Sequence, residues 1–69
     1  ESNPLQPFSK MLFIIQSENE RGFWSNKQGW VFGVEQATKF TAAEVERTGP
    51  TPTVISKGND ARWQVYKYD

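Results

Sequence analysis

Few side chains in this sequence could perform catalysis, and they do not converge. The 69 residues include no histidine and no cysteine, which supply most catalytic bases, thiolate nucleophiles and zinc ligands. Glu44 and Glu46 fall on opposite flanks of a short predicted helix. Glu18 and Glu20 alternate in a predicted loop, so neither pair of carboxylates forms an acid–base site. We therefore expect no enzymatic activity, no catalytic residue, no metal site and no cofactor.

Aromatic residues gathered around a turn are the clearest candidates for binding. Residues 21–33, R-G-F-W-S-N-K-Q-G-W-V-F-G, contain two phenylalanines and two tryptophans. Tryptophan, tyrosine and arginine dominate the binding energy of many protein interfaces, and the last predicted strand carries these residue types. The candidate partner-binding residues are Trp24, Lys27, Trp30, Phe32, Arg62, Trp63, Tyr66 and Lys67.

Strand alternation leaves two arrangements of this aromatic turn open. In one arrangement, Phe23 and Val31 point into the core. Trp24, Trp30 and Phe32 then face outward, where they are free to bind a partner. In the other arrangement the two tryptophans fill the core, because a domain of this size needs the apolar area that aromatic rings supply.

Two classes of partner fit such a surface. A protein is the first expectation, because eight Lys and Arg residues balance eight Asp and Glu residues, so no net field attracts a phosphate polymer or an anionic membrane. Single-stranded nucleic acid is the alternative, with aromatic rings stacking on bases beside Lys27, Arg62 and Lys67. Residues 26–33 resemble the ribonucleoprotein motif of cold-shock domains but lack its central glycine. We expect no membrane partner, and a homodimer is a further expectation.

The elements that position these residues belong to one small domain. Residues 1–10 contain two prolines and no periodicity, which predicts a flexible leader before a natural start at Met11. Residues 11–69 form the predicted domain. The sequence shows no signal-peptide pattern and no apolar run of about 20 residues, so we expect a cytoplasmic protein.

Apolar and turn residues predict the sheet. Residues 11–15 are apolar at five successive positions, which is typical of a central strand with both faces buried. The predicted strands are residues 11–16, 23–25, 30–32, 53–56 and 61–68. The first three form an antiparallel meander, and a turn at residues 57–60 joins the last two into a C-terminal hairpin.

Capping residues predict one short helix over residues 42–48. Thr41 and Glu44 match a capping box, and Gly49-Pro50 matches a helix end. A single helix over residues 34–48 is the competing interpretation, because apolar residues recur at helical spacing there as well. The predicted class is α+β, with a small antiparallel sheet and one short helix.

Several short motifs resemble small uncharacterised proteins of tailed phages and other bacterial mobile elements. After the apolar first strand come F-W-S-N at 23–26, G-W at 29–30, A-T-x-F-T-x-x-E at 37–44 and a closing Trp63. The resemblance spans about fifty residues and carries no known activity. Together with the small size and the missing catalytic residues, it favours an accessory or inhibitory protein that binds a host or phage protein. The long segment 48–57, with two prolines, departs from the pattern.

Overall fold

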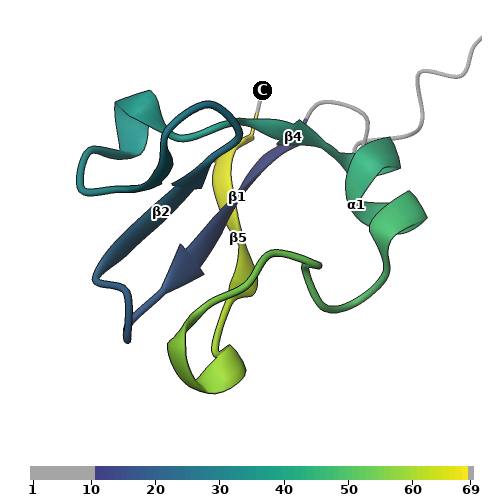
Figure 1. Cartoon of the computed structure of the whole chain (residues 1–69). Helices are drawn as coiled ribbons and strands as arrows, with labels where there is room; N and C mark the ends of the chain where they lie inside the picture. Colours follow the sequence, from purple (N-terminus) through teal and green to yellow (C-terminus); the bar gives the residue numbers. More distant parts are fainter. Residues whose placement is uncertain (1–10, 69) are drawn as a thin grey trace, which may run out of the picture.

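In the part of the chain that the structure describes, residues 11–68, one antiparallel sheet and one α-helix make up the fold (Figure 1). The structure is a computed structural model. The predicted leader, residues 1–10, lies outside the residues that it describes. The elements are β1 (Met11–Ser17), β2 (Gly22–Ser25), β3 (Gly29–Val31), the 3-10 helix η2 (Val34–Gln36), β4 (Phe40–Thr41), α1 (Ala42–Thr48), the 3-10 helix η3 (Lys57–Asn59) and β5 (Arg62–Tyr68). The predicted α+β class is confirmed.

Strand β1 is the centre of the sheet. It pairs with β5 along one edge, while β2 and β4 share its other edge. Ile14 and Ile15 are adjacent and point to opposite faces, yet only 3% and 2% of their surface is exposed. Both faces are therefore covered at β1, which confirms the prediction that residues 11–15 belong to a central strand.

The strand register gathers the three tryptophans, with Phe13 and Phe40, on one face of the sheet. Phe13 pairs with Phe40 and Ile15 pairs with Trp63. Directly opposed residues share a face, and alternation along β2 adds Trp24 to that face. Helix α1 follows directly on β4 and lies beside the strands in Figure 1. We call this side the aromatic face; it is defined by Phe13, Ile15, Trp24, Trp30, Phe40 and Trp63.

Helix α1 has the bounds that its capping residues predict. The Thr41 hydroxyl accepts a hydrogen bond from the backbone N–H of Glu44, and the Glu44 carboxylate accepts one from the backbone N–H of Thr41. At the other end Gly49, with φ of 109°, donates its N–H to the carbonyl of Val45. A residue with a side chain is strained at such a φ, so glycine suits this position.

The competing interpretation, one helix over residues 34–48, is wrong. Helix η2 ends at Gln36, and Ala37 is extended, with φ of −73° and ψ of 151°. The next backbone N–H, that of Thr38, is donated to the carbonyl of Trp24 at 3.0 Å instead of to a helical partner. Tertiary pairing with β2 therefore outweighs the helical spacing of the apolar residues.

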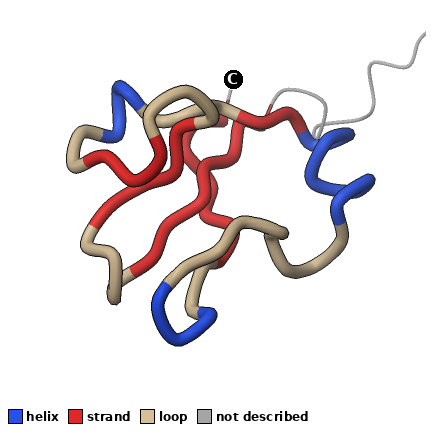
Figure 2. The backbone as a smooth tube through the Cα atoms, in the orientation of Figure 1, coloured by secondary structure: helices blue, strands red, loops and turns tan. Residues whose placement is uncertain are grey.

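The predicted strand over residues 53–56, and with it the C-terminal hairpin, is not formed. Figure 2 shows the chain between α1 and β5 as loop apart from η3. Strand β5 pairs with β1 instead. Pro50 and Pro52 lack the N–H that a strand ladder needs, and Pro52 is buried. Within residues 11–68, no helix is long and apolar enough to cross a membrane.

Candidate functional site

The hairpin of β2 and β3 brings two tryptophans directly opposite each other. Trp24 pairs with Trp30, and their rings meet edge to face, with centroids 5.3 Å apart and planes at 72°. The hydroxyl of buried Ser25 accepts hydrogen bonds from the backbone N–H groups of Lys27 and Gln28. This side-chain bonding holds the turn, so the hairpin is a fixed platform.

The register decides between the two arrangements that alternation leaves open. Trp24 and Trp30 lie on the aromatic face, whereas Phe23 pairs with Gln16 and lies on the opposite face with Val31. The arrangement in which Phe23 and Val31 share the face of Phe13 and Ile15 is therefore wrong. Both tryptophans are half-buried. They contribute to the core and still present part of each ring to solvent.

Both indole N–H groups of the hairpin already have partners inside the protein. Trp24 Nε1 donates to Asn26 Oδ1 at 2.9 Å. Trp30 Nε1 donates to the carbonyl of Ile55 at 3.2 Å, which ties the hairpin to the connection between α1 and β5. A partner that binds here would therefore contact the rings through apolar surface.

Two large apolar residues close to Trp30 in the chain or in its hydrogen bonding have almost fully exposed side chains. Phe32 follows β3 and is 84% exposed. Ile55, whose carbonyl accepts the Trp30 indole N–H, is 85% exposed. We call Trp24, Trp30, Phe32 and Ile55 together the hairpin surface. Ile55 is not among the binding residues predicted from the sequence, because it falls in the predicted strand at residues 53–56.

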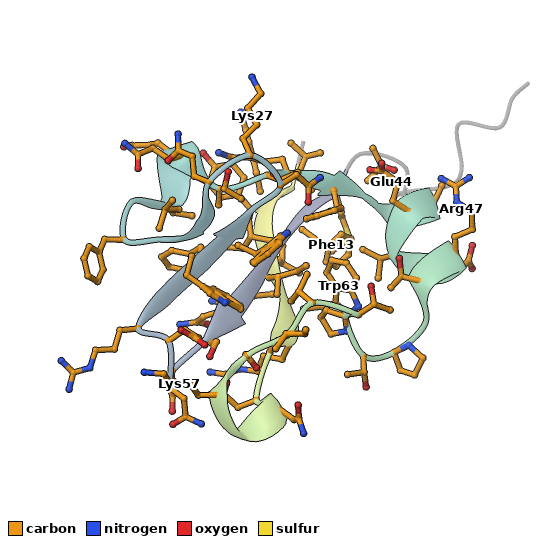
Figure 3. All side chains as sticks on the ribbon, viewed as in Figure 1. Phe13, Lys27, Glu44, Arg47, Lys57 and Trp63 are labelled. Carbon is orange, nitrogen blue, oxygen red and sulfur yellow. The ribbon has the colours of Figure 1, made fainter. Side chains whose placement is uncertain are left out.

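The remaining predicted binding residues do not join the hairpin surface. Lys27 points away from the sheet at the exposed tip of the hairpin (Figure 3). The other four predicted residues are on β5, which pairs with the edge of β1 opposite β2. Two strand spacings, about 10 Å, therefore separate β5 from β2.

Three of the predicted side chains on β5 contact other parts of the fold. Arg62 forms a salt bridge with Glu18 at 3.3 Å. Trp63 stacks edge to face on Phe40 and donates Nε1 to the carbonyl of Gly49 at 3.0 Å; Figure 3 shows it between the strands and α1. Tyr66 lies under the ammonium of Lys39, 4.9 Å from the ring centroid.

The basic residues of the predicted set are also far apart, with Lys27 in the hairpin turn and the other two on β5. Arg62 pairs with Gln16 near one end of β1, while Lys67 pairs with Leu12 near the other. A backbone-tracking groove for nucleic acid needs cations in a row. The structure does not bring Lys27, Arg62 and Lys67 together into such a row.

A second cluster, at the turn predicted over residues 57–60, joins the β1–β2 loop to η3. The Asp60 carboxylate accepts hydrogen bonds from the Ser17 hydroxyl and from the backbone N–H groups of Glu18 and Asn19. The Asn19 side chain donates to the carbonyl of Lys57 at 2.8 Å. These donors stabilise the ionised form and lower the pKa of Asp60, with the Ser17 hydrogen bond as the largest cause.

This cluster holds two loops together, and its carboxylates are already engaged. The Glu20 carboxylate accepts the backbone N–H of Lys57 at 3.0 Å, and the Glu18 carboxylate pairs with Arg62. We call Ser17, Glu18, Asn19, Glu20, Lys57 and Asp60 the polar clamp. Among the residues that the structure describes, no three His, Cys, Asp or Glu side chains lie close enough together to hold a metal ion.

Comparison of the chain with protein-family models, with curated proteins and with solved structures finds no match.

Proposed function

We propose that this chain is a non-catalytic protein-binding module, and that it binds its partner through the hairpin surface. The observation that carries the proposal is the exposure of Phe32 and Ile55, 84% and 85%. Phe32 lies two residues after the half-buried Trp30, and the Ile55 carbonyl accepts the Trp30 indole hydrogen bond. Large apolar side chains that stay in water beside a fixed aromatic platform are typical of interaction sites.

The free energy of binding would come from removing these side chains from water. Fully burying a phenylalanine or isoleucine side chain contributes about 1.5–3 kcal/mol. Trp30 is already held by its hydrogen bond to Ile55 and by the ring of Trp24, so little of its conformational entropy remains to be lost. The partner is a protein that presents an apolar pocket wide enough for the ring of Phe32.

A protein fits the charges around this surface better than single-stranded nucleic acid does. Lys39, the basic residue between η2 and β4, donates its ammonium to the carbonyls of Val34, Glu35 and Ala37. Arg62 is paired with Glu18. Cations with partners inside the fold have less to gain from phosphates, which supply most of the affinity for nucleic acids.

The accessory or inhibitory character, and a cytoplasmic setting, are part of the same proposal. They rest on the resemblance of residues 23–44 and Trp63 to small proteins of phages and mobile elements, and on a sequence without cysteine. A small module that binds a host or phage protein needs only one such surface.

The test places a photo-crosslinking analogue, p-benzoylphenylalanine, at position 32 and irradiates the protein in a bacterial lysate. The crosslinked protein is then purified, and its affinity for the wild type and for Phe32→Ala is measured by calorimetry. We expect Phe32→Ala to weaken binding about 30-fold or more, which corresponds to the loss of a hot-spot residue of about 2 kcal/mol.

The matched control is Val65→Ala, which shortens another exposed apolar side chain, on β5. Its affinity should stay within about threefold of the wild type, as expected for a residue outside the interface. Equal affinities of Phe32→Ala and the wild type would contradict the proposal. Titration with a single-stranded oligonucleotide at low salt tests the alternative: tight binding that Phe32→Ala abolishes would assign the surface to nucleic acid.

A further inference from the structure

The connection between β3 and β4 folds around the ammonium group of Lys39. The Lys39 Nζ donates to the carbonyls of Val34, Glu35 and Ala37, at 2.9, 2.8 and 2.9 Å. An ammonium group has three N–H donors and no acceptor, so each of its donors has one backbone carbonyl. The hydrogen bonding of this half-buried cation is therefore complete within the protein.

Helix η2, which supplies two of these carbonyls, is too short to hold its own shape. It has three residues, and 3-10 helices have poorer hydrogen-bond geometry than α-helices. The N–H of Gln36 donates to the carbonyl of Gly33 at 3.0 Å, and the N–H of Ala37 donates to that of Val34 at 3.1 Å. Hydrogen bonds with an ionised donor are about twice as strong as neutral ones, so Lys39 contributes a large share of what holds this turn.

The ring of Tyr66 is a further neighbour of the same ammonium. The Lys39 Nζ lies 4.9 Å from the ring centroid, within the range of a cation–π interaction. Lys39 directly precedes β4 and Tyr66 belongs to β5, and these two strands pair with opposite edges of β1. The contact therefore reaches across β1 and ties the connection after β3 to the far side of the sheet.

The connection held in this way joins two parts of the molecule with different roles. It runs from the exposed Phe32 of the hairpin surface to Phe40, whose ring packs on the aromatic face. Within it, Ala37 is only 5% exposed, and Thr38 donates its N–H to the carbonyl of Trp24 at 3.0 Å. The bonds of Lys39 therefore act on the backbone that links the hairpin surface to β4.

We propose that residues 34–37 and Tyr66 form a binding site for a primary ammonium group, that Lys39 occupies it from within the chain, and that this occupancy keeps the β3–β4 connection folded. Three carbonyl oxygens within 2.8–2.9 Å of one nitrogen match the three diverging N–H donors of such a group. A planar guanidinium directs its donors in a fork, and a quaternary ammonium has no N–H donor. The ligand class of the site is therefore a primary alkylammonium.

The variant Lys39→Met separates the ammonium from the side chain that carries it. Methionine keeps an unbranched apolar side chain and removes the three donors. We expect the amide hydrogens of Gln36 and Ala37 to exchange about tenfold faster or more, because the turn opens more often without its charged hydrogen bonds. The matched control is Lys27→Met at the exposed tip of the hairpin, which should leave both exchange rates unchanged.

The variant Lys39→Ala tests whether the site binds an ammonium from solution. It removes the atoms from Cγ to Nζ, which n-propylammonium replaces atom for atom. We expect n-propylammonium chloride to slow the exchange of the Gln36 and Ala37 amides progressively with concentration, because the ion binds the folded connection and not the open one. Tetramethylammonium chloride at the same concentration should not slow it. Lys39→Met should not respond to n-propylammonium, because its own side chain fills the space.

Unchanged exchange in Lys39→Met overturns the proposal. So does Lys39→Ala if n-propylammonium fails to slow its exchange, or if the two salts slow it equally. Circular dichroism shows that each variant is folded, and the response to n-propylammonium distinguishes a bound ammonium from a loss of packing. These measurements use the protein without a partner, so their failure leaves the proposed binding through the hairpin surface untouched.

Discussion

Two edge-to-face aromatic pairs lie on the same face of the sheet with nearly the same geometry. Trp24 and Trp30 have ring centroids 5.3 Å apart at 72°, and Phe40 and Trp63 have centroids 5.3 Å apart at 76°. In each pair a tryptophan donates its indole N–H to a backbone carbonyl of the connection between α1 and β5. The local chemistry of the two pairs is therefore almost identical.

Their positions in the chain differ. Trp24 and Trp30 belong to one hairpin, so their contact follows from a local turn. Phe40 and Trp63 belong to β4 and β5, which flank opposite edges of β1, so their contact requires the whole sheet to be assembled. The same ring geometry thus closes the fold in one place and builds a surface platform in the other, because neighbours, not ring geometry, determine what a pair stabilises.

The two pairs should differ most in stability when one ring is removed from each. We expect Trp63→Ala to lower the free energy of unfolding by about 3–5 kcal/mol, because it leaves a cavity between sheet and helix and orphans the Gly49 carbonyl. A domain this small has about 3–5 kcal/mol in total, so the variant should be largely unfolded at 25 °C. Urea unfolding followed by circular dichroism measures both effects.

Trp24→Ala is the matched variant in the hairpin. It removes a ring of the same type, but its indole N–H bonds only to nearby Asn26. The loss of unfolding free energy should be about 1–2 kcal/mol, and the variant should still fold. Equal losses for the two variants would mean that the hairpin pair is as essential to the core as the long-range pair.

Lowering the pH should destabilise the region around Trp63 before it destabilises the hairpin. Asp60 lies three residues before Trp63, in the polar clamp. Its folded pKa is below the ordinary value of 3.8, so its contribution to stability is present above that value and is lost as the pH falls through the folded pKa. In protein labelled with 5-fluorotryptophan, the fluorine signal of Trp63 should broaden at higher pH than those of Trp24 and Trp30.

A carbon-13 titration of the Asp60 carboxyl group checks the cause directly. Ser17→Ala removes the strongest hydrogen bond to this carboxylate, so the Asp60 titration should move up toward 3.8. An Asp60 that titrates at or above 3.8 in the wild type would contradict the assignment. The effect on the melting temperature should be smaller than that of Trp63→Ala, since the aromatic rings remain in place.

The contrast between local and long-range contacts also explains what the sequence could predict. The capping box of Thr41 and Glu44, with Gly49 after it, predicts α1 to the residue, because all three signals lie within one short segment. The polar clamp is not predicted from the sequence, because Asp60 accepts hydrogen bonds from donors more than forty residues away. No local sequence pattern indicates such a contact.

The predicted strand at residues 53–56 fails for the same reason. Val54 and Ile55 have strand propensity, but the flanking prolines and the indole of Trp30 determine where this segment lies. The exposed Ile55 of the hairpin surface is a product of that placement. Phe32 and Trp30 are local to the hairpin and belong to the predicted site. The position of β5 relative to the hairpin depends on which strands pair, so the sequence alone did not predict it.

The smallest effect on stability is expected for the ring that packs least against the rest of the fold. Phe32→Ala should change the free energy of unfolding by no more than about 0.5 kcal/mol, because 84% of the side chain is exposed and few contacts are lost. Phe40→Ala makes the same chemical change on the ring that packs against Trp63, and it should cost about 3 kcal/mol or more. Thermal and urea unfolding of the two variants measure the difference.

A large loss for Phe32→Ala would mean that its ring packs in solution, and the hairpin surface would then lose one of its two most exposed side chains. A negligible loss leaves Phe32 as an aromatic ring that the fold does not need, which is the property that a binding residue requires.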